Sequence, residues 1–298
     1  MSSQVASITA AAAGTLNLGG EVTVNRLGFG AMRLTGPGIW GPPKDREAAI
    51  AVLRRAVELE VNFIDTADSY GPAVSEELIA EALHPYPKGF VIATKGGWNR
   101  PGPGQWTHDS SPKHLREAIE GSLKRLRLDC IELYQLHTPD PAISFDASID
   151  TLAQLKAAGK IHFIGLSNVT REHIERARRI TQIVSVQNRY SVFDREWEHV
   201  LDYCEQNEIA FIPWFPLGGG GIGHDLLSHI AQAHGVKPIQ IANAWLLQRS
   251  PAMLPIPGTS SVEHLEENIA AATIRLKEDE FRLLDEVNGK TAAGRVRG

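Results

Sequence analysis

The stretch VNFIDTADSYGPAVSEELIAEALHPYPKGFVIATK, residues 61–95, contains the unit from which the fold can be predicted. It begins with an apolar run that ends at Asp65 and continues into an amphipathic segment near residues 75–83. A second apolar run follows at residues 90–94. Continuous apolar runs of this length are typical of buried parallel strands, and a helical segment joins these two. The stretch therefore predicts a strand–helix–strand unit.

The same unit recurs along the chain of 298 residues. We expect strands near residues 27–31, 61–65, 90–94, 131–136, 161–166, 183–187, 209–214 and 252–256. We expect helices near residues 46–59, 75–83, 112–127, 146–158, 170–180, 195–207, 237–249 and 261–272. Eight strands that alternate with eight helices predict an α/β fold, the (β/α)8 TIM barrel. A β-hairpin around Gly19 and Gly20 should precede the barrel, and an extra helix near residues 278–288 should follow it.

Composition and the ends of the chain set further limits. No linker divides the chain, so we expect residues 1–15 to be a flexible tail and residues 16–298 to be a single domain. A net charge of −5 without a basic run argues against a nucleic-acid or membrane partner. Cys130 and Cys204 lie far apart and are predicted to be free thiols. No Lys or Arg precedes Arg26, so no secretory signal is predicted and we expect a cytoplasmic protein.

Polar side chains stand at the predicted strand ends, where the active site of such a barrel lies. Asp65 ends one strand, Lys95 follows the next, and Tyr70 lies on the loop between them. His137 follows the strand at 131–136. Each has a plainer explanation when taken alone: a loop-capping aspartate, a packing tyrosine, an exposed lysine or a structural histidine. Together they indicate proton donation to a carbonyl oxygen, because an ammonium beside a tyrosine lowers the pKa of the hydroxyl. Asp65 would keep Lys95 charged, and His137 could donate a hydrogen bond to the same oxygen.

A glycine-rich segment resembles a dinucleotide-binding fingerprint. Gly218, Gly220 and Gly223 satisfy the spacing G-x-G-x-x-G. The segment follows the seventh predicted strand rather than the first, and no acidic residue ends a strand about 20 residues later, as the fingerprint requires. We therefore reject a Rossmann fold. These glycines still suit close approach of the backbone to phosphate, since phosphate sites in barrels often follow strands seven and eight.

Eight motifs, in this order, closely resemble those of the aldo-keto reductases. They are LGFGAM at 27–32, FIDTADSYG at 63–71, ATKGG around Lys95, QLH at 135–137, GLSN at 165–168, VQNRY at 186–190, PWFPLG at 213–218 and IPGTSSVEHLEEN at 256–268. Any one of them is weak, but the full series is specific. The resemblance implies an NAD(P)H-dependent reductase that converts an aldehyde or ketone to an alcohol by hydride transfer.

The resemblance also implies roles for individual residues. Tyr70 would be the general acid, with Asp65, Lys95 and His137 as its catalytic partners. The cofactor would contact Met32, Ser167, Asn168, Gln187, Trp214, Leu217, Gly218, Gly219, Gly258, Thr259, Ser260, His264, Glu267 and Asn268. Within this set, the residues at 167, 168 and 187 match those that bind the nicotinamide carboxamide. Trp214 stands where the family usually stacks a tyrosine on the nicotinamide ring.

The chain departs from the family pattern at the adenosine end. Many NADPH-dependent members have a lysine at the position of Gly258 and an arginine at that of His264. We expect NADPH as the cofactor, with NADH as an alternative. The resemblance further implies a monomer that takes a small carbonyl substrate, and no metal is expected.

Two long loops after the first and third strands carry tryptophans. Trp40, Trp98 and Trp106 are predicted to wall the substrate pocket, with loop-packing aromatics as the alternative. The loop sequences look most like a bacterial subgroup that includes pyridoxal reductases, which suggests a pyridoxal-type aromatic aldehyde. Arg33 and Arg189 lie near strand ends and could meet an anionic group, although surface arginines are the plainer interpretation.

Two functions of other classes remain open at this point. One is a cofactor-binding regulatory subunit on the same fold, which the intact set of four catalytic residues argues against. The other is a lyase or isomerase that forms a Schiff base on Lys95. A lysine held charged by Asp65 is a poor free amine, so this alternative is also disfavoured.

Overall fold

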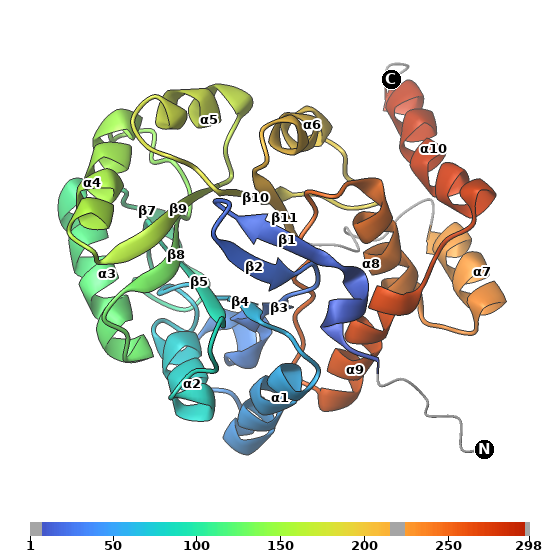
Figure 1. The fold of residues 1–298 in the computed structure, drawn as a ribbon, viewed down its shortest axis with the longest axis horizontal. Coiled ribbons are helices and arrows are strands. Elements are labelled where there is room, and N and C mark those ends of the chain that lie inside the picture. The colour runs from blue at the N-terminus through green and yellow to red at the C-terminus, as the bar shows by residue number, and fades with distance from the viewer. Residues whose placement is uncertain (1–7, 215–223, 296–298) are drawn as a thin grey trace.

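A computed structural model describes residues 8–214 and 224–295, and its centre is a parallel sheet curled into a barrel (Figure 1). In the described residues the sheet has seven strands in the order β11-β10-β9-β8-β5-β4-β3. They are β3 (Phe29–Gly30), β4 (Phe63–Asp65), β5 (Val91–Gly96), β8 (Ile131–Leu136), β9 (Ile161–Ser167), β10 (Ser185–Arg189) and β11 (Ala210–Trp214). Seven of the eight predicted strands are therefore confirmed to within two residues at each end.

Helices surround the sheet on its outer side (Figure 1). The eight predicted helices are confirmed as α1 (Arg46–Glu58), α2 (Val74–Leu83), α3 (Pro112–Leu126), α4 (Phe145–Ala157), α5 (Arg171–Arg178), α6 (Glu198–Gln206), α8 (Pro238–Arg249) and α9 (Val262–Ala270). Their starts carry capping side chains: Asp45 accepts from Ala48 N at 2.9 Å, and Ser111 caps α3 ahead of Pro112. The extra C-terminal helix is α10 (Glu278–Arg295), whereas α7 (His224–His234) was not predicted.

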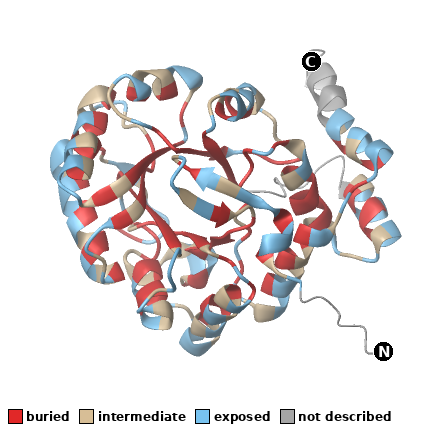
Figure 2. Cartoon of the chain, in the orientation of Figure 1, coloured by how far each residue is buried: buried red, intermediate tan, exposed pale blue. Residues whose placement is uncertain are grey.

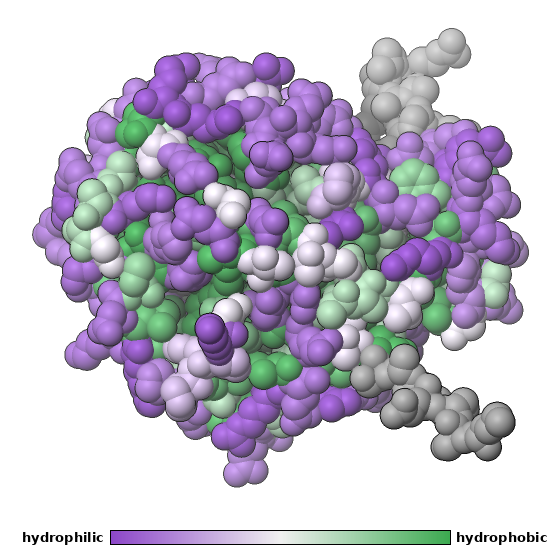
Figure 3. Space-filling model, viewed as in Figure 1, coloured by the Kyte–Doolittle hydropathy of each residue, from purple (hydrophilic) through white to green (hydrophobic). Residues whose placement is uncertain are grey.

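The outer helices present mainly hydrophilic side chains on the face drawn in Figure 3. Burial is concentrated in the strands and on the inner sides of the helices (Figure 2). Within the described residues, no helix is both long and apolar enough to cross a bilayer.

The prediction of an eighth strand at residues 252–256 is wrong in detail. Met253 forms an isolated parallel bridge with Phe211, but the segment is not a regular strand. Leu254 N donates to Phe211 O at 2.9 Å, and Gly28 N donates to Pro255 O at 2.9 Å. Because Pro255 has no N–H of its own, the ladder cannot continue along the segment. These bonds join the first and last strands, so the segment still closes the barrel.

The N-terminal hairpin is confirmed as β1 (Thr15–Leu18) paired antiparallel with β2 (Val22–Asn25). It lies across the middle of the barrel in Figure 1. Leu18 and Val24 are fully buried and belong to the same apolar cluster as residues inside the barrel. The hairpin therefore plugs one end of the barrel and leaves the strand ends at the other end for function.

The predicted flexible tail is partly wrong. Residues 1–7 lie outside the described residues, but Ala10–Ala13 form a 3-10 helix with Ala10 fully buried. Ala10 N donates to Leu59 O at 2.8 Å, just after α1. The small alanine side chains let this turn pack closely, so the packed chain begins before residue 15.

The alternation of side chains along each strand determines which residues face the barrel interior. Successive side chains on a strand point to opposite faces, so residues two apart share a face. On β5 and β8, Ala93 and Leu133 are opposite each other in the apolar interior, and Lys95 and Gln135 are opposite each other two residues further on. The interior therefore changes from apolar to polar at the C-terminal ends of the strands.

Candidate active site

A cavity of about 990 Å³ opens at this polar end of the barrel. Its lining comes from nearly every strand end and from α8 and α9. It includes most of the predicted site residues: Met32, Asp65, Tyr70, Trp98, Trp106, His137, Ser167, Asn168, Gln187, Trp214, Gly258, Thr259, His264, Glu267 and Asn268. Residues that are distant in the chain are thus brought to one surface, as the strand-end argument predicted. Three of the predicted cofactor contacts, Leu217, Gly218 and Gly219, lie outside the described residues.

At the base of the cavity, a buried ion pair joins neighbouring strands. Lys95 Nζ donates to Asp65 Oδ2 at 2.7 Å and to Thr66 O at 2.9 Å. The side chain of Lys95 is completely inaccessible to solvent. Burial has the largest single effect and lowers the pKa of Lys95, but the charge of Asp65, together with Tyr70 and the hydrogen bonds to both residues, raises the pKa above its ordinary value. Lys95 is therefore held as an ammonium ion.

The other oxygen of Asp65 is bound by two amides. Gln187 Nε2 donates to Asp65 Oδ1 at 2.7 Å, and Gln135 Nε2 donates to it at 3.2 Å. Gln135 also accepts from Ser185 Oγ at 3.4 Å. Gln135 was not proposed as a site residue, although its position two residues before His137 on a strand placed it on the inner face. Both oxygens of the buried carboxylate are thus used to hold it in place.

Tyr70 lies between this ion pair and the cavity. Its hydroxyl oxygen is 3.4 Å from Lys95 Nζ, and its side chain is buried except for the part that lines the cavity. Burial raises the pKa of the Tyr70 hydroxyl above its ordinary value, and the charge of Lys95 offsets only part of this rise. The expectation that Lys95 would bring the pKa of Tyr70 below its ordinary value is therefore wrong for this state. The hydroxyl keeps its proton at neutral pH.

His137 lies beside the tyrosine as a neutral ring. The rings of Tyr70 and His137 meet edge to face with centroids 5.8 Å apart. Burial and then the charge of Lys95 hold the pKa of His137 well below its ordinary value. A neutral imidazole has one N–H donor and one acceptor nitrogen. His137 can therefore donate one hydrogen bond without adding a second positive charge beside Lys95.

Asp68 is a titratable residue near the site that the sequence analysis did not single out. Its backbone N donates to Lys95 O at 3.1 Å, and its Oδ1 is buried without a partner among the described residues. Burial raises the pKa of Asp68 to about 8. At neutral pH this carboxyl is mostly protonated, which leaves Asp65 as the carboxylate that balances Lys95.

Two amides project into the cavity at the ends of β9 and β10. Asn168 has a positive φ of 57° and donates to His137 O at 3.1 Å and to Ser167 Oγ at 3.2 Å. Because the Nε2 group of Gln187 is used on Asp65, its carbonyl oxygen is left to accept from the cavity. Ser167, Asn168 and Gln187 thus form a polar group on the cavity wall, and their contact with the nicotinamide carboxamide stays a prediction.

Part of the cavity wall is formed by a tight backbone contact. A β carbon on Gly258 would lie 2.4 Å from Gly30 O, and one on Gly30 would lie 2.7 Å from Ile256 O. Only glycine permits this approach of the first strand to the segment that closes the barrel. The family's lysine is therefore sterically excluded at residue 258. Nearby, Lys237 at the start of α8 forms an ion pair with Glu267 of α9, and both line the cavity.

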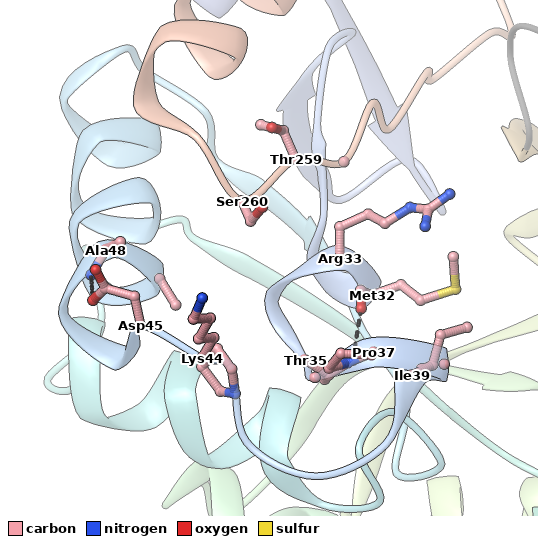
Figure 4. A pocket seen from close by; sticks show the side chains of 15 residues that line it. Met32, Arg33, Thr35, Pro37, Ile39, Lys44, Asp45, Ala48, Thr259 and Ser260 are labelled. Carbon is pink, nitrogen blue, oxygen red and sulfur yellow. Dashed lines mark hydrogen bonds between the residues drawn. The ribbon is translucent and has the colours of Figure 1, made fainter. Parts of the chain in front are cut away.

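A second cavity of about 750 Å³ adjoins the first (Figure 4). The two share Met32, Arg33, Ile39, Gly258 and Thr259, whereas Ser260 lines only the second.

The charged lining of the second cavity comes mainly from the loop before α1. Lys44 points across the cavity toward Ser260, while Asp45 turns to cap α1 at Ala48 (Figure 4). The cavity therefore offers a cation opposite the start of α9.

Not all of the tryptophans and arginines that were predicted near the substrate line a cavity. Trp98 and Trp106 line the first cavity and meet edge to face with centroids 5.8 Å apart. Trp40 lines neither cavity, so its predicted contact with substrate is not supported; its ring lies 5.4 Å from the guanidinium of Arg100. Arg189 is paired with Asp194 at 2.8 Å, whereas Arg33 lines both cavities.

Fold and site together define an oxidoreductase built on a (β/α)8 barrel. The model of the aldo/keto reductase family matches residues 26–289. The chain belongs to this family and is an NAD(P)H-dependent oxidoreductase.

Several known proteins are similar over nearly the whole chain. An uncharacterized oxidoreductase of Schizosaccharomyces pombe is 50% identical over 281 residues, which cover 94% of this chain and 91% of that protein. Pyridoxine 4-dehydrogenase of Escherichia coli is 44% identical over 277 residues, 90% of this chain and 96% of the enzyme. The crystal structure of an aldo-keto reductase from Klebsiella pneumoniae in complex with NADPH has a TM-score of 0.78 at 26% identity and covers 92% of this chain and 94% of its own.

Proposed function

We propose that this protein reduces an aldehyde to an alcohol with NADPH, and that Tyr70 donates the proton. The observation that carries the proposal is the chain of contacts from Asp65 through Lys95 to Tyr70. This chain of contacts ends at the hydroxyl of Tyr70, which lies on the cavity wall. The hydroxyl oxygen is 3.4 Å from the buried ammonium group of Lys95. Such a hydroxyl is protonated at neutral pH. The adjacent ammonium ion stabilises the tyrosinate that forms when the proton leaves.

The residues around Tyr70 stabilise the charges that develop as its proton passes to the carbonyl oxygen. When bound, the nicotinamide supplies a hydride to the carbonyl carbon. The oxygen then gains negative charge and takes the proton of Tyr70. Lys95 stabilises the tyrosinate that remains, and Asp65 keeps Lys95 charged and aimed. The N–H of His137 provides a second donor to the carbonyl oxygen. A Schiff base on Lys95 is disfavoured, because a fully buried ammonium ion is neither neutral nor accessible.

The residues of the larger cavity fit a dinucleotide. Ser167, Asn168 and Gln187 offer donors and acceptors to a carboxamide, and the ring of Trp214 is partly exposed at the end of β11. The cavity extends from these residues to Glu267 and Asn268 on α9. The relative from K. pneumoniae, crystallised with NADPH, supports the same cofactor here.

A cation for the 2′-phosphate is available from the loop before α1 rather than from the family's usual positions. Replacing Lys44 with Met should raise KM for NADPH about tenfold and leave KM for NADH unchanged, since a charge-assisted hydrogen bond would be removed only with the phosphate. Lys113→Met is the matched control, because it also removes one exposed cation that has a carboxylate neighbour, and Lys113 lines neither cavity. Equal loss with both cofactors in Lys44→Met, or no loss with NADPH, would place the phosphate elsewhere.

An aromatic aldehyde of the pyridoxal type suits the substrate end. Trp98 and Trp106 form an apolar corner beside Tyr70 and His137, which flat rings can fill. The similarity to pyridoxine 4-dehydrogenase supports the same substrate class.

Steady-state kinetics with NADPH and NADH against a panel of aldehydes tests the function. We expect kcat/KM for pyridoxal and benzaldehyde to exceed that for propanal at least about tenfold, because aromatic contact area adds binding energy. Absence of turnover with every aldehyde and both cofactors would reject the proposed function. Turnover that favours propanal would reject only the substrate class.

A further inference from the structure

Arg100 ties together three separate loops around the substrate end of the cavity. It lies in the loop between β6 (Trp98–Asn99) and β7 (Thr107–His108), a short hairpin that the sequence analysis did not predict. Its Nη1 donates to Ile39 O at 3.0 Å and to Ser69 O at 2.9 Å. Its Nε donates to Gln105 O at 3.1 Å. One guanidinium thus joins the loop after β3, the loop that carries Tyr70, and its own hairpin loop.

The same guanidinium also packs against the aromatic wall. Its Cζ lies 3.7 Å from the ring of Trp106 and 5.4 Å from that of Trp40. Trp106 in turn meets Trp98 edge to face, and Trp98 lies 6.3 Å from the ring of His137. Stacking of a guanidinium on an indole is favourable and directional. Arg100 therefore contacts one of the two lining tryptophans directly and the other through it.

One of the carbonyl groups held by Arg100 belongs to a strained residue. Ile39 has a φ of 58°, which is unfavourable for a β-branched side chain. Its side chain lines both cavities. Such a conformation persists only where surrounding contacts hold it. The hydrogen bond from Arg100 to Ile39 O supplies one such contact.

We propose that Arg100 is a positioning residue that sets the shape of the substrate end and makes it selective for flat aromatic aldehydes. This inference rests on the proposed aldehyde reduction. Arg100 lines neither cavity itself and acts through Ile39, Trp106 and the backbone before Tyr70. Without it, the strained loop relaxes and the indole of Trp106 has no stacking partner.

The geometry requires arginine rather than any cation. The planar guanidinium presents five donors in a fixed arrangement and can stack while it donates. A lysine at residue 100 has three donors on one atom, so it cannot reach carbonyl groups on three loops and cover Trp106 at the same time. Arg100→Lys should therefore resemble Arg100→Met more than the wild type.

The test compares KM and kcat for benzaldehyde and propanal in Arg100→Met, Arg100→Lys and the control Arg54→Met. Arg54 is exposed, its described hydrogen bond joins it to Ala82 O at 3.5 Å, and it lines neither cavity. In both Arg100 variants we expect KM for benzaldehyde to rise about tenfold, the size of effect that removing one apolar group from a pocket produces. KM for propanal, kcat, and NADPH affinity measured by fluorescence titration should change less than about twofold. Arg54→Met should match the wild type.

Outcomes that overturn the inference are distinct from those that reject the function. If the wild type reduces both aldehydes and the Arg100 variants keep their KM for benzaldehyde, Arg100 does not shape the site. A proportional loss with both aldehydes, together with a lower Tm, would mean a general structural role. Full rescue by Arg100→Lys would mean that only the charge matters and would also overturn the proposal. Loss of all turnover in the wild type would instead reject the proposed function.

Discussion

The Tyr70→Phe variant is expected to lose about 100- to 10,000-fold in kcat for aldehyde reduction, the usual contribution of a positioned general acid. Phenylalanine keeps the ring that packs against His137, with centroids 5.8 Å apart in the wild type. Lys95 keeps its bonds to Asp65 Oδ2 and Thr66 O, so no buried charge is left unpaired. The substitution therefore removes a proton donor and little else.

Two measurements separate this loss from damage to the site. The dissociation constant for NADPH, followed by quenching of tryptophan fluorescence, should stay within about twofold of the wild type, because no hydrogen bond to the cofactor is changed. The free energy of unfolding should change by about 1 kcal/mol or less, the usual net value of one hydrogen bond. Near-wild-type kcat would reject Tyr70 as the acid.

Lys95→Met is expected to have the largest effect on stability. It leaves the Asp65 carboxylate buried with only the amides of Gln135 and Gln187 as partners. Breaking a buried ion pair from one side costs about 3–5 kcal/mol. We expect a loss of this size in denaturant unfolding, and a loss of activity as well, because the tyrosinate would have no positive neighbour.

The double variant Asp65→Asn/Lys95→Met separates folding from chemistry. Removing both charges should restore most of the missing stability, while activity should remain as low as in Lys95→Met. Arg46→Met is the matched control, because it breaks an exposed, solvent-screened ion pair with Glu81 and should lose far less stability than Lys95→Met. If Lys95→Met is no less stable than this control, the buried pair does not stabilise the barrel as inferred.

The regular alternation of strands and helices along the chain explains why so much of the barrel was predictable. Apolar runs and helical periodicity depend on residues close in the chain, so seven strands and eight helices could be placed from the sequence alone. The predicted strand at residues 252–256 was wrong because regular pairing needs an N–H at every ladder position, and Pro255 has none. The helix α7 was missed because the repeating unit supplies one helix after each strand, whereas both α7 and α8 follow β11 among the described elements.

Part of the candidate site could likewise be predicted from the sequence, and part could not. Asp65, Lys95 and His137 could be assigned because strand ends in a parallel barrel meet on one face. The amide groups that donate to Asp65 could not be assigned, because Gln135 and Gln187 lie on β8 and β10, neither of which is paired with the strand of Asp65. The pKa direction of Tyr70 was mispredicted for a related reason: burial is a property of the whole packed barrel, and here it outweighs one neighbouring charge.

The sequence by itself determined the repeating strand–helix unit, the polar residues that follow the strands, and the family. Each of these depends on local spacing or on the order of motifs along the chain. Only the tertiary structure decided that Gly258 must be glycine, that Lys44 faces Ser260, and that Arg100 joins three loops. These facts come from contacts between segments far apart in the chain, and close packing, which spacing does not encode, sets their distances.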